Sequence, residues 1–205
     1  MKNSVEIYSK LPLNFYRREL LEVAPDLLGK AFVHTTNNKI LAGVIVEVEA
    51  YDGRIDKAAH SYGGVTQRNK VMFEKGGLLY VYFIYGMHYC CNVVTGDEGI
   101  GNAVLIRAVQ PILGIENMIQ NRFPDGNIND KKMVNLTNGP AKLTQALEID
   151  RNYNGIKLSD DIVYLCDSSH PKNFEIGVSK RIGIKKSAEL PWRFYIKNNS
   201  YVSKK

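Results

Sequence analysis

The chain has 205 residues, of which 44% are hydrophobic and 23% are charged, a composition that is ordinary for a globular protein with its own core. Its net charge of +6 favours partners that carry phosphate or an anionic membrane surface, although charge alone identifies none of them. The three cysteines form no CxxC motif, which argues against a zinc site and favours reduced thiols in a cytoplasmic protein.

The first part of the chain predicts two short helices followed by two paired strands. A helical pattern over residues 16–29 is interrupted by Pro25. Strands are predicted over residues 30–36 and 39–50, of which the second is the clearer because it ends in alternation. The Asn-Asn pair at 37–38 indicates a hairpin turn between them. The opening MKNSVEIYSK contains no long apolar stretch, so we expect no secretory signal.

The remaining elements alternate irregularly between strand and helix. The segment IDKAAHS (55–61) is compatible with a short helix, and the polar stretch FPDGNINDKKMVN (123–135) predicts a surface loop. Helices are predicted over residues 113–123 and 139–149, the second with Pro140 at its first helical position. Further strands are predicted over residues 78–84, 88–95, 103–112, 162–167, 174–184 and 192–197.

The order of these elements indicates the fold class. Strands dominate, and no βαβ rhythm is present, which favours an α+β fold with a curved, mainly antiparallel sheet flanked by helices. We find neither a repeat nor a linker and therefore expect one domain over residues 1–205. The ends, residues 1–9 and 204–205, are expected to be flexible.

The stretch LLYVYFIYGMHYCCN (78–92) is rich in tyrosine and apolar residues. It is too short and too polar for a membrane span, which needs about 20 apolar residues. As a strand, it places Tyr80 and Tyr82 on one face and Phe83 and Tyr85 on the other. By the same rule, the adjacent cysteines that end this stretch point to opposite faces.

The stretch VIVEVEAY (44–51) places two carboxylates among apolar residues. Glu47 and Glu49 are two positions apart on a predicted strand and therefore share a face, which Tyr51 continues. One interpretation is that this face meets solvent. The other is a catalytic carboxylate beside an aromatic platform, and the residues alone do not separate Glu47 from Glu49. A glycosidase that uses both as acid and base is disfavoured, because neighbours on one face do not flank a substrate.

Other site motifs receive little support. Asp52, Asp56 and His60 are spaced by four, but the adjacent Gly53 makes a helical metal-binding face doubtful, so we predict no metal site. Neither a GxxxxGK[ST] loop nor a GxSxG motif is present.

Four stretches in this order resemble the alkyladenine (3-methyladenine) DNA glycosylase family. They are IVEVEAYDGRIDKAAHSYGG (45–64), RNKVMFEKGGLLYVYFIYGMHYCCNVV (68–94), NGPAKLTQALEI (138–149) and RFYIKNNSYVS (193–203). The resemblance covers roughly residues 10–203. It implies a monofunctional enzyme that hydrolyses the N-glycosidic bond of a damaged purine turned out of double-stranded DNA.

The resemblance also assigns residues to this chemistry. It implies that Glu49 is the general base for the attacking water and that Arg107 helps to hold that water and the nearby phosphate. The extruded base would stack on Tyr51 on one side and on His60 and Tyr82 on the other.

The remaining assignments concern specificity and the duplex. By resemblance, Asn92 would crowd the exocyclic amino group of guanine, and Tyr85 would fill the gap left in the duplex. Arg68, Met72 and Lys142 would lie at the DNA backbone. The resemblance implies a monomer without a cofactor or metal and without membrane association. The alternative is a nucleic-acid-binding module without catalysis, which charge and aromatic content alone also fit.

Overall fold

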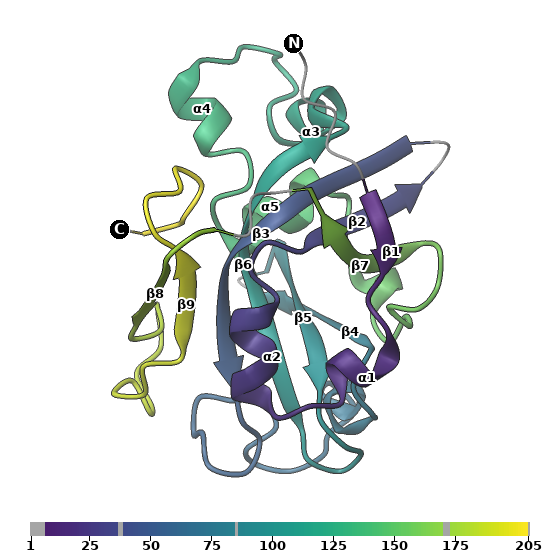
Figure 1. The fold of residues 1–205 in the computed structure, drawn as a ribbon, viewed down its shortest axis with the longest axis vertical. Helices are drawn as coiled ribbons and strands as arrows, with labels where there is room; N and C mark the ends of the chain where they lie inside the picture. The colour runs from purple at the N-terminus through teal and green to yellow at the C-terminus, as the bar shows by residue number, and fades with distance from the viewer. Residues whose placement is uncertain (1–6, 37–38, 85, 170–172, 205) are drawn as a thin grey trace.

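The structure is a computed structural model that describes residues 7–36, 39–84, 86–169 and 173–204 (Figure 1). Within these ranges, nine strands form one antiparallel sheet, with the order β1-β7-β2-β3-β6-β5-β4 and with β9 joining β3 to β8. The strands are β1 (Ile7–Lys10), β2 (Ala31–Thr36), β3 (Lys39–Tyr51), β4 (Leu79–Ile84), β5 (His88–Thr95), β6 (Asn102–Leu113), β7 (Val163–Ser168), β8 (Ile176–Ser179) and β9 (Arg193–Ile196).

The helices are short, and α1 and α2 lie in front of the sheet in Figure 1. None in the described chain is long and apolar enough to cross a membrane. The α-helices are α1 (Leu13–Tyr16), α2 (Leu20–Asp26), α3 (Ile115–Arg122), α4 (Asp130–Val134) and α5 (Pro140–Ala146), and the 3₁₀ helices are η1 (Lys70–Phe73) and η2 (Arg151–Tyr153). The predicted α+β fold with an antiparallel sheet is confirmed.

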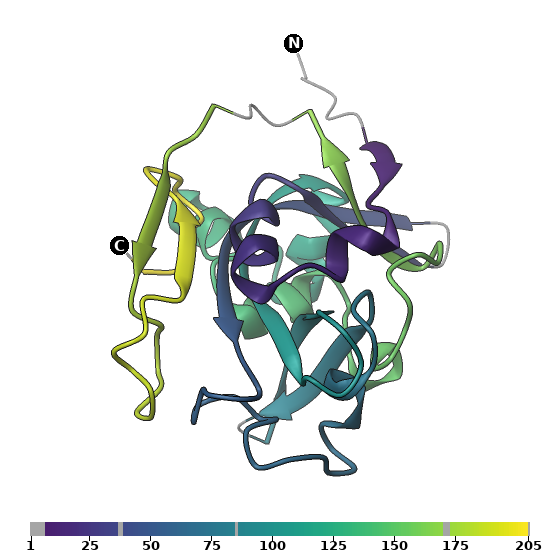
Figure 2. The same cartoon turned by 60° about the horizontal axis from the view of Figure 1, so that its bottom comes forward.

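Strand β3 is the junction of the sheet. It is 13 residues long and pairs with β6 along one edge. Along its other edge, its first half pairs with β2, and residues 47–49 pair with β9. The hairpin of β8 and β9 thereby forms a separate arm at one side of the molecule (Figure 2). The second half of β3 therefore lies between two neighbouring strands.

Two hydrophobic clusters occupy the two faces of the central strands. The main core contains Val48, Ala50 and Ile106, together with apolar residues of α2 and α5. A smaller cluster contains Tyr80, Tyr82, Cys90 and Leu105 and packs against Met72 of η1. Cys91 belongs to the main core, so the two adjacent cysteines do point to opposite faces as predicted.

Several local predictions differ from the structure. Pro25, which was expected to interrupt the helical pattern, lies inside α2 (Leu20–Asp26). Residues 55–61 form turns rather than a helix, because the Asp52 and Asp56 side chains accept hydrogen bonds from backbone N–H groups two residues ahead. The stretch 123–135 contains α4, which begins where the Asn129 side chain accepts a hydrogen bond from the Lys132 amide. The structure places Ile7–Lys10 in β1, where pairing with β7 orders a segment that has no strong signal of its own.

The predicted turn at 37–38 lies outside the described residues. The strands on either side of it pair as an antiparallel ladder that begins with Thr36 opposite Lys39.

Candidate functional site

One rung across the sheet places four side chains on the same face. Glu49 is opposite Leu105, which is opposite Asn92, which in turn is opposite Tyr80. Residues directly opposite each other in antiparallel strands point to the same side of a sheet. Moving two positions along the strands adds Tyr51, Tyr82, Cys90 and Arg107 to this face.

A cavity of about 430 Å³ opens on this face. Segments from distant parts of the chain complete its wall, including the N-terminal end of α5 and the loop that follows β8. The lining residues are Tyr51, Ala58, His60, Met72, Tyr80, Tyr82, Ile84, Cys90, Asn92, Leu105, Arg107, Gly139, Pro140, Ala141, Lys142, Ile182, Gly183 and Ile184.

Aromatic rings form one side of the cavity. The His60 and Tyr82 rings meet edge to face with their centroids 4.5 Å apart, and Tyr80 stacks on Tyr82 at 5.4 Å. The Tyr80 hydroxyl lies 3.2 Å from Nδ1 of His60 and so fixes the imidazole in this wall. Tyr80 is buried, and its contact with His60 was not predicted.

Tyr51 lines the cavity on the strand that carries both glutamates. Its hydroxyl donates a hydrogen bond of 2.8 Å to Oε2 of Glu49. The guanidinium of Arg181 lies 4.6 Å from the centre of the Tyr51 ring, a distance typical of a cation–π contact.

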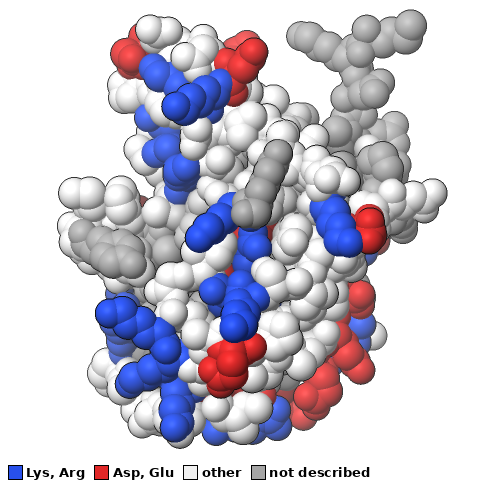
Figure 3. Space-filling view, turned by 90° about the vertical axis from the view of Figure 1, so that its left-hand side faces the viewer, with Lys and Arg blue, Asp and Glu red and all other residues white. Residues whose placement is uncertain are grey.

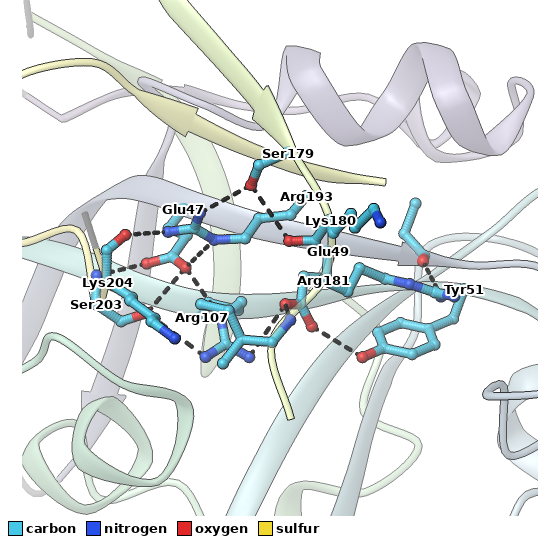
Figure 4. A network of polar contacts seen from close by, with 12 residues as sticks. Glu47, Glu49, Tyr51, Arg107, Ser179, Lys180, Arg181, Arg193, Ser203 and Lys204 are labelled. Carbon is cyan, nitrogen blue, oxygen red and sulfur yellow. Dashed lines mark hydrogen bonds and ion pairs between the residues drawn. The ribbon is translucent and has the colours of Figure 1, made fainter. Parts of the chain in front are cut away.

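Glu49 is fully buried behind the cavity wall, which excludes the interpretation that this face of the strand meets solvent. Its Oε1 accepts a hydrogen bond of 2.7 Å from the Ile182 amide and pairs with Nη1 of Arg107 at 3.3 Å (Figure 4). A carboxylate can accept about four hydrogen bonds. Within the described chain, Oε2 accepts only from Tyr51, which leaves it able to accept from one water molecule.

Glu47 is also fully buried, but its oxygens are more heavily occupied. Oε1 accepts from Nε of Arg107 at 3.0 Å, from Nε of Arg193 at 2.7 Å and from Oγ of Ser203 at 2.9 Å. Oε2 accepts from the Ser203 amide at 2.6 Å. Glu47 thus accepts four hydrogen bonds, and of its partners only Arg107 lines the cavity, whereas Glu49 contacts Tyr51, Arg107 and Ile182, all of which do.

Irregular pairing beside Glu47 directs Arg107 toward both carboxylates. Val48 is opposite Ile106, and Glu47 is opposite Ala108, so Arg107 is an additional residue on β6. Such β-bulges re-aim side chains, often at active sites.

Burial and neighbouring charge set the protonation states in the site. Burial alone would lower the pKa of Arg107, but the Glu49 and Glu47 carboxylates outweigh it and the pKa is raised, so the guanidinium stays charged. Burial, followed by the charge of Glu49, raises the pKa of Tyr51 and keeps its proton in place. Burial, followed by the charge of Arg68, lowers the pKa of His60, which is therefore neutral at pH 7.

Two further residues assigned by resemblance, Asn92 and Lys142, also line the cavity. Asn92 is buried in its wall, and its Nδ2 donates to the Tyr80 carbonyl at 3.4 Å. Lys142 reaches the cavity from α5 and donates to Asn135 and Asn138.

The residues assigned to the duplex are less uniform in position. Arg68 is exposed beside the Tyr82 ring, with its guanidinium 5.6 Å from the ring centre. Met72 is buried in the cavity wall, a placement that does not favour a phosphate contact by its side chain. Tyr85 lies outside the described residues.

A buried ion pair that the sequence analysis missed holds two cavity loops together. Arg181 pairs with Asp56, both side chains are fully buried, and Arg181 also donates to the Ala50 carbonyl at 2.9 Å. The pair joins the loop that carries His60 to the loop that supplies the Ile182 amide. Arg181 lies inside the predicted strand 174–184, which ends at Ser179 in the structure. No local pattern reveals its partner, because Asp56 is 125 positions away.

Positive charge gathers on the side of the molecule that carries β8 and β9. Figure 3 shows groups of Lys and Arg side chains spread over this face, with acidic side chains at its upper end, near its lower centre and toward one lower corner. The basic groups fit a polyanionic partner. Among the described residues, no group of three or more His, Cys, Asp or Glu side chains could hold a metal ion.

Comparison with known proteins gives a consistent result over nearly the full chain. Residues 14–200 match the methylpurine-DNA glycosylase family. A protein of Alkaliphilus oremlandii named "Putative 3-methyladenine DNA glycosylase" is 48% identical over 203 residues, which cover 96% of this chain and 100% of the relative. A protein of Francisella tularensis with the same name is 49% identical over 192 residues, covering 92% of this chain and 96% of the relative.

Proposed function

The chain belongs to the methylpurine-DNA glycosylase family, and from this premise we propose that it removes alkylated or deaminated purines, of the 3-methyladenine and hypoxanthine type, from double-stranded DNA. The observation that carries the proposal is the buried carboxylate of Glu49. It contacts Tyr51 and Arg107, and both of these side chains line a cavity with aromatic walls.

The cavity would receive a purine turned out of the duplex. Its volume of about 430 Å³ lies in the range of small-molecule sites. Tyr51 on one side and His60 with Tyr82 on the other would stack on the base, and such stacking contributes about 1–3 kcal/mol per base. Because burial keeps His60 neutral, this wall would not repel a purine that alkylation has made cationic.

Hydrolysis would then use Glu49 as the base. Its free acceptor position on Oε2 would orient a water molecule, whose oxygen attacks C1′ of the sugar while its proton passes to the carboxylate. The bond between C1′ and the purine nitrogen breaks, and its electron pair leaves with the base. The sugar becomes positively charged in the transition state, which a nearby carboxylate stabilises. An alkylated cationic purine leaves directly, whereas hypoxanthine has to be protonated.

The other assigned residues would select the damaged base and bind the DNA duplex. Asn92, held in the wall by its contact with the Tyr80 carbonyl, would exclude the amino group of undamaged guanine. Arg68 and Lys142 would contact phosphates, and Tyr85 would fill the gap in the duplex. The assignment of Met72 to the DNA backbone rests on the resemblance alone. Its buried side chain in the cavity wall favours contact with the extruded base instead. Action as a monomer in the cytoplasm remains part of the proposal.

Base release from duplexes that contain 3-methyladenine or hypoxanthine tests the proposal. We expect release by the wild type and a loss of about 10²–10⁴-fold in Glu49→Gln, the range typical of a lost general base. Glu116→Gln on α3, which is not among the residues that line the cavity, is the matched control. Full activity of Glu49→Gln would refute the catalytic assignment. Tight DNA binding without release by the wild type would favour the non-catalytic binding module.

A further inference from the structure

Glu47 is the carboxylate that the proposed chemistry does not use. It is as buried as Glu49, and three donors occupy its Oε1 while the Ser203 amide occupies its Oε2. Of the residues that bind it, only Arg107 lines the cavity, so the carboxylate is not placed to orient a water beside an extruded base. We propose that Glu47 is a positioning residue that holds the guanidinium of Arg107 against Glu49 and ties the site to the C-terminal segment. This inference rests on the function proposed above.

The geometry of Arg107 supports this role. Its Nε donates to Glu47, and its Nη1 faces Glu49 at 3.3 Å. A guanidinium is planar and rigid, so a hydrogen bond that fixes Nε also fixes the direction of Nη1. The β-bulge brings Arg107 between the glutamates, but its side chain still requires an anchor, and Glu47 supplies it (Figure 4).

A second arginine balances the charge of this cluster. Arg193 of β9 donates to Glu47 through Nε, to Ser179 through Nη1 at 2.9 Å and to the Lys204 carbonyl through Nη2 at 2.5 Å. Glu47 and Glu49 thus share two guanidinium groups, which makes the buried cluster neutral. A buried carboxylate without such partners would be strongly unfavourable.

The C-terminal segment is part of the same arrangement. Ser203 donates to Glu47 through both its amide and its hydroxyl, and Arg107 Nη2 lies 3.5 Å from the same hydroxyl. The neighbouring Val202 packs into the main core. The segment therefore closes the side of the arginine that faces away from the cavity, 156 positions after Glu47 in the sequence.

The change Glu47→Gln would disturb this arrangement with almost no change in volume. The amide group would bring N–H donors toward the Ser203 amide or toward the arginines, all of which are donors themselves. Arg193 would lose the carboxylate with which it pairs. Arg107 would lose its anchor and could turn away from Glu49.

Single-turnover base release, measured together with binding to a duplex that carries a stable abasic-site analogue, tests the inference. We expect Glu47→Gln to release base about 100-fold more slowly, as for a misplaced catalytic group, with unchanged affinity for the analogue duplex. In an Arg107→Ala background, Glu47→Gln should cause no further loss, because there is then no guanidinium to position. A purely structural role would lower the rate in both backgrounds. Ser179→Ala, which removes a contact of Arg193 but none of Arg107, is the control and should match the wild type.

The outcomes separate this inference from the proposed function. If the wild type releases base and Glu49→Gln does not, but Glu47→Gln keeps the wild-type rate, only the inference is overturned. If the wild type releases no base, the proposed function itself fails. Should Glu47→Gln not fold, Ser203→Ala keeps every charge and should lose about tenfold in rate. An unchanged rate in Ser203→Ala would then overturn the inference.

Discussion

The Tyr51 hydroxyl donates a hydrogen bond of 2.8 Å to Oε2 of Glu49, two positions earlier on the same strand. The aromatic wall of the cavity and the carboxylate behind it are therefore parts of one element. Glu49 is paired on both edges, opposite Leu105 of β6 and Arg193 of β9, and Tyr51 is paired with Ala103 of β6. Rigid support of this kind is what a catalytic group requires.

Substitution of Tyr51 can separate these two contributions. Tyr51→Phe keeps the ring and removes the donor to Glu49, so we expect base release to slow by about tenfold, the lower end of the range for a lost hydrogen bond to a charged group. Tyr51→Ala also removes the stacking surface and should weaken binding of the extruded base further, by about 1–3 kcal/mol. Single-turnover rates and titration with lesion-containing duplexes measure the two effects. Equal rates for Tyr51→Phe and the wild type would contradict a role for the hydroxyl.

The buried pair of Arg181 and Asp56 should be important for stability. Arg181→Met leaves Asp56 charged and buried, which costs about 3–5 kcal/mol in the free energy of unfolding. The double variant Arg181→Met/Asp56→Leu removes both charges and should regain part of this loss. Urea unfolding measures both changes.

The matched control for this pair is Lys132→Gln, which breaks the exposed pair with Asp125 and should cost less than about 1 kcal/mol. Equal losses in Arg181→Met and Lys132→Gln would show that burial of the Arg181 pair is not what stabilises the fold.

Two histidines should make stability depend on pH: His34, which is fully buried, and His60, whose side chain is exposed at the cavity rim. Burial is the main cause that lowers the pKa of both His34 and His60 below the ordinary value of 6.5. Between the lowered pKa and 6.5, the unfolded chain binds more protons than the folded chain, so stability rises with pH in that interval. Stability is therefore complete above pH 6.5 and falls as the pH decreases below it, by up to about 1.4 kcal/mol per pH unit for the proton on buried His34. The contribution of the exposed His60 is smaller, because solvent screens it.

Thermal unfolding between pH 7.5 and 5 measures this dependence. His34→Gln should flatten the decline, because His34 is fully buried with Nδ1 2.7 Å from the Leu147 carbonyl, which fixes the neutral tautomer. The partly exposed His88, changed to Gln, is the control. An identical decline in His34→Gln and the wild type would exclude His34 as its source.

Salt dependence of binding can identify the phosphate contacts. Each contact with a phosphate contributes about 0.9 to the slope of log K against log salt concentration on duplex DNA. Arg68→Gln and Lys142→Gln should each reduce that slope by about 1 and weaken binding to all sequences similarly. Lys10→Gln, on β1 at the other end of the sheet, should leave the slope unchanged. Unaltered slopes in the first two variants would remove these residues from the interface.

Local patterns were sufficient to place side chains on the two faces of individual strands. The alternation in VIVEVEAY placed Glu47, Glu49 and Tyr51 on one face, and the structure confirms this through their shared contacts. The predicted common face of Tyr80 and Tyr82 is confirmed by their stacking. Alternation follows from backbone geometry within one strand, so it can be read without knowledge of the fold.

Local patterns failed where a distant segment decides the environment. The glutamates were compatible with a solvent-facing strand because nothing near them in the sequence reveals β6, β9 or the C-terminal segment. Ile182 and Ser203 reach these carboxylates from 133 and 156 positions away. Only the resemblance to a family distinguished Glu49 from Glu47; the structure adds a physical difference, which is the number of donors on each carboxylate.

The sequence by itself determined the faces of the strands, most of the elements and the family. Each of these follows from spacing, turn chemistry or motif order along the chain. Only the tertiary structure decided that Glu49, Asn92 and Tyr80 lie on one rung, that Arg107 stands between two carboxylates, and that Arg181 joins two loops. Those relationships depend on strand register and on partners far along the chain, which are fixed by packing of the whole molecule rather than by local conformational preference.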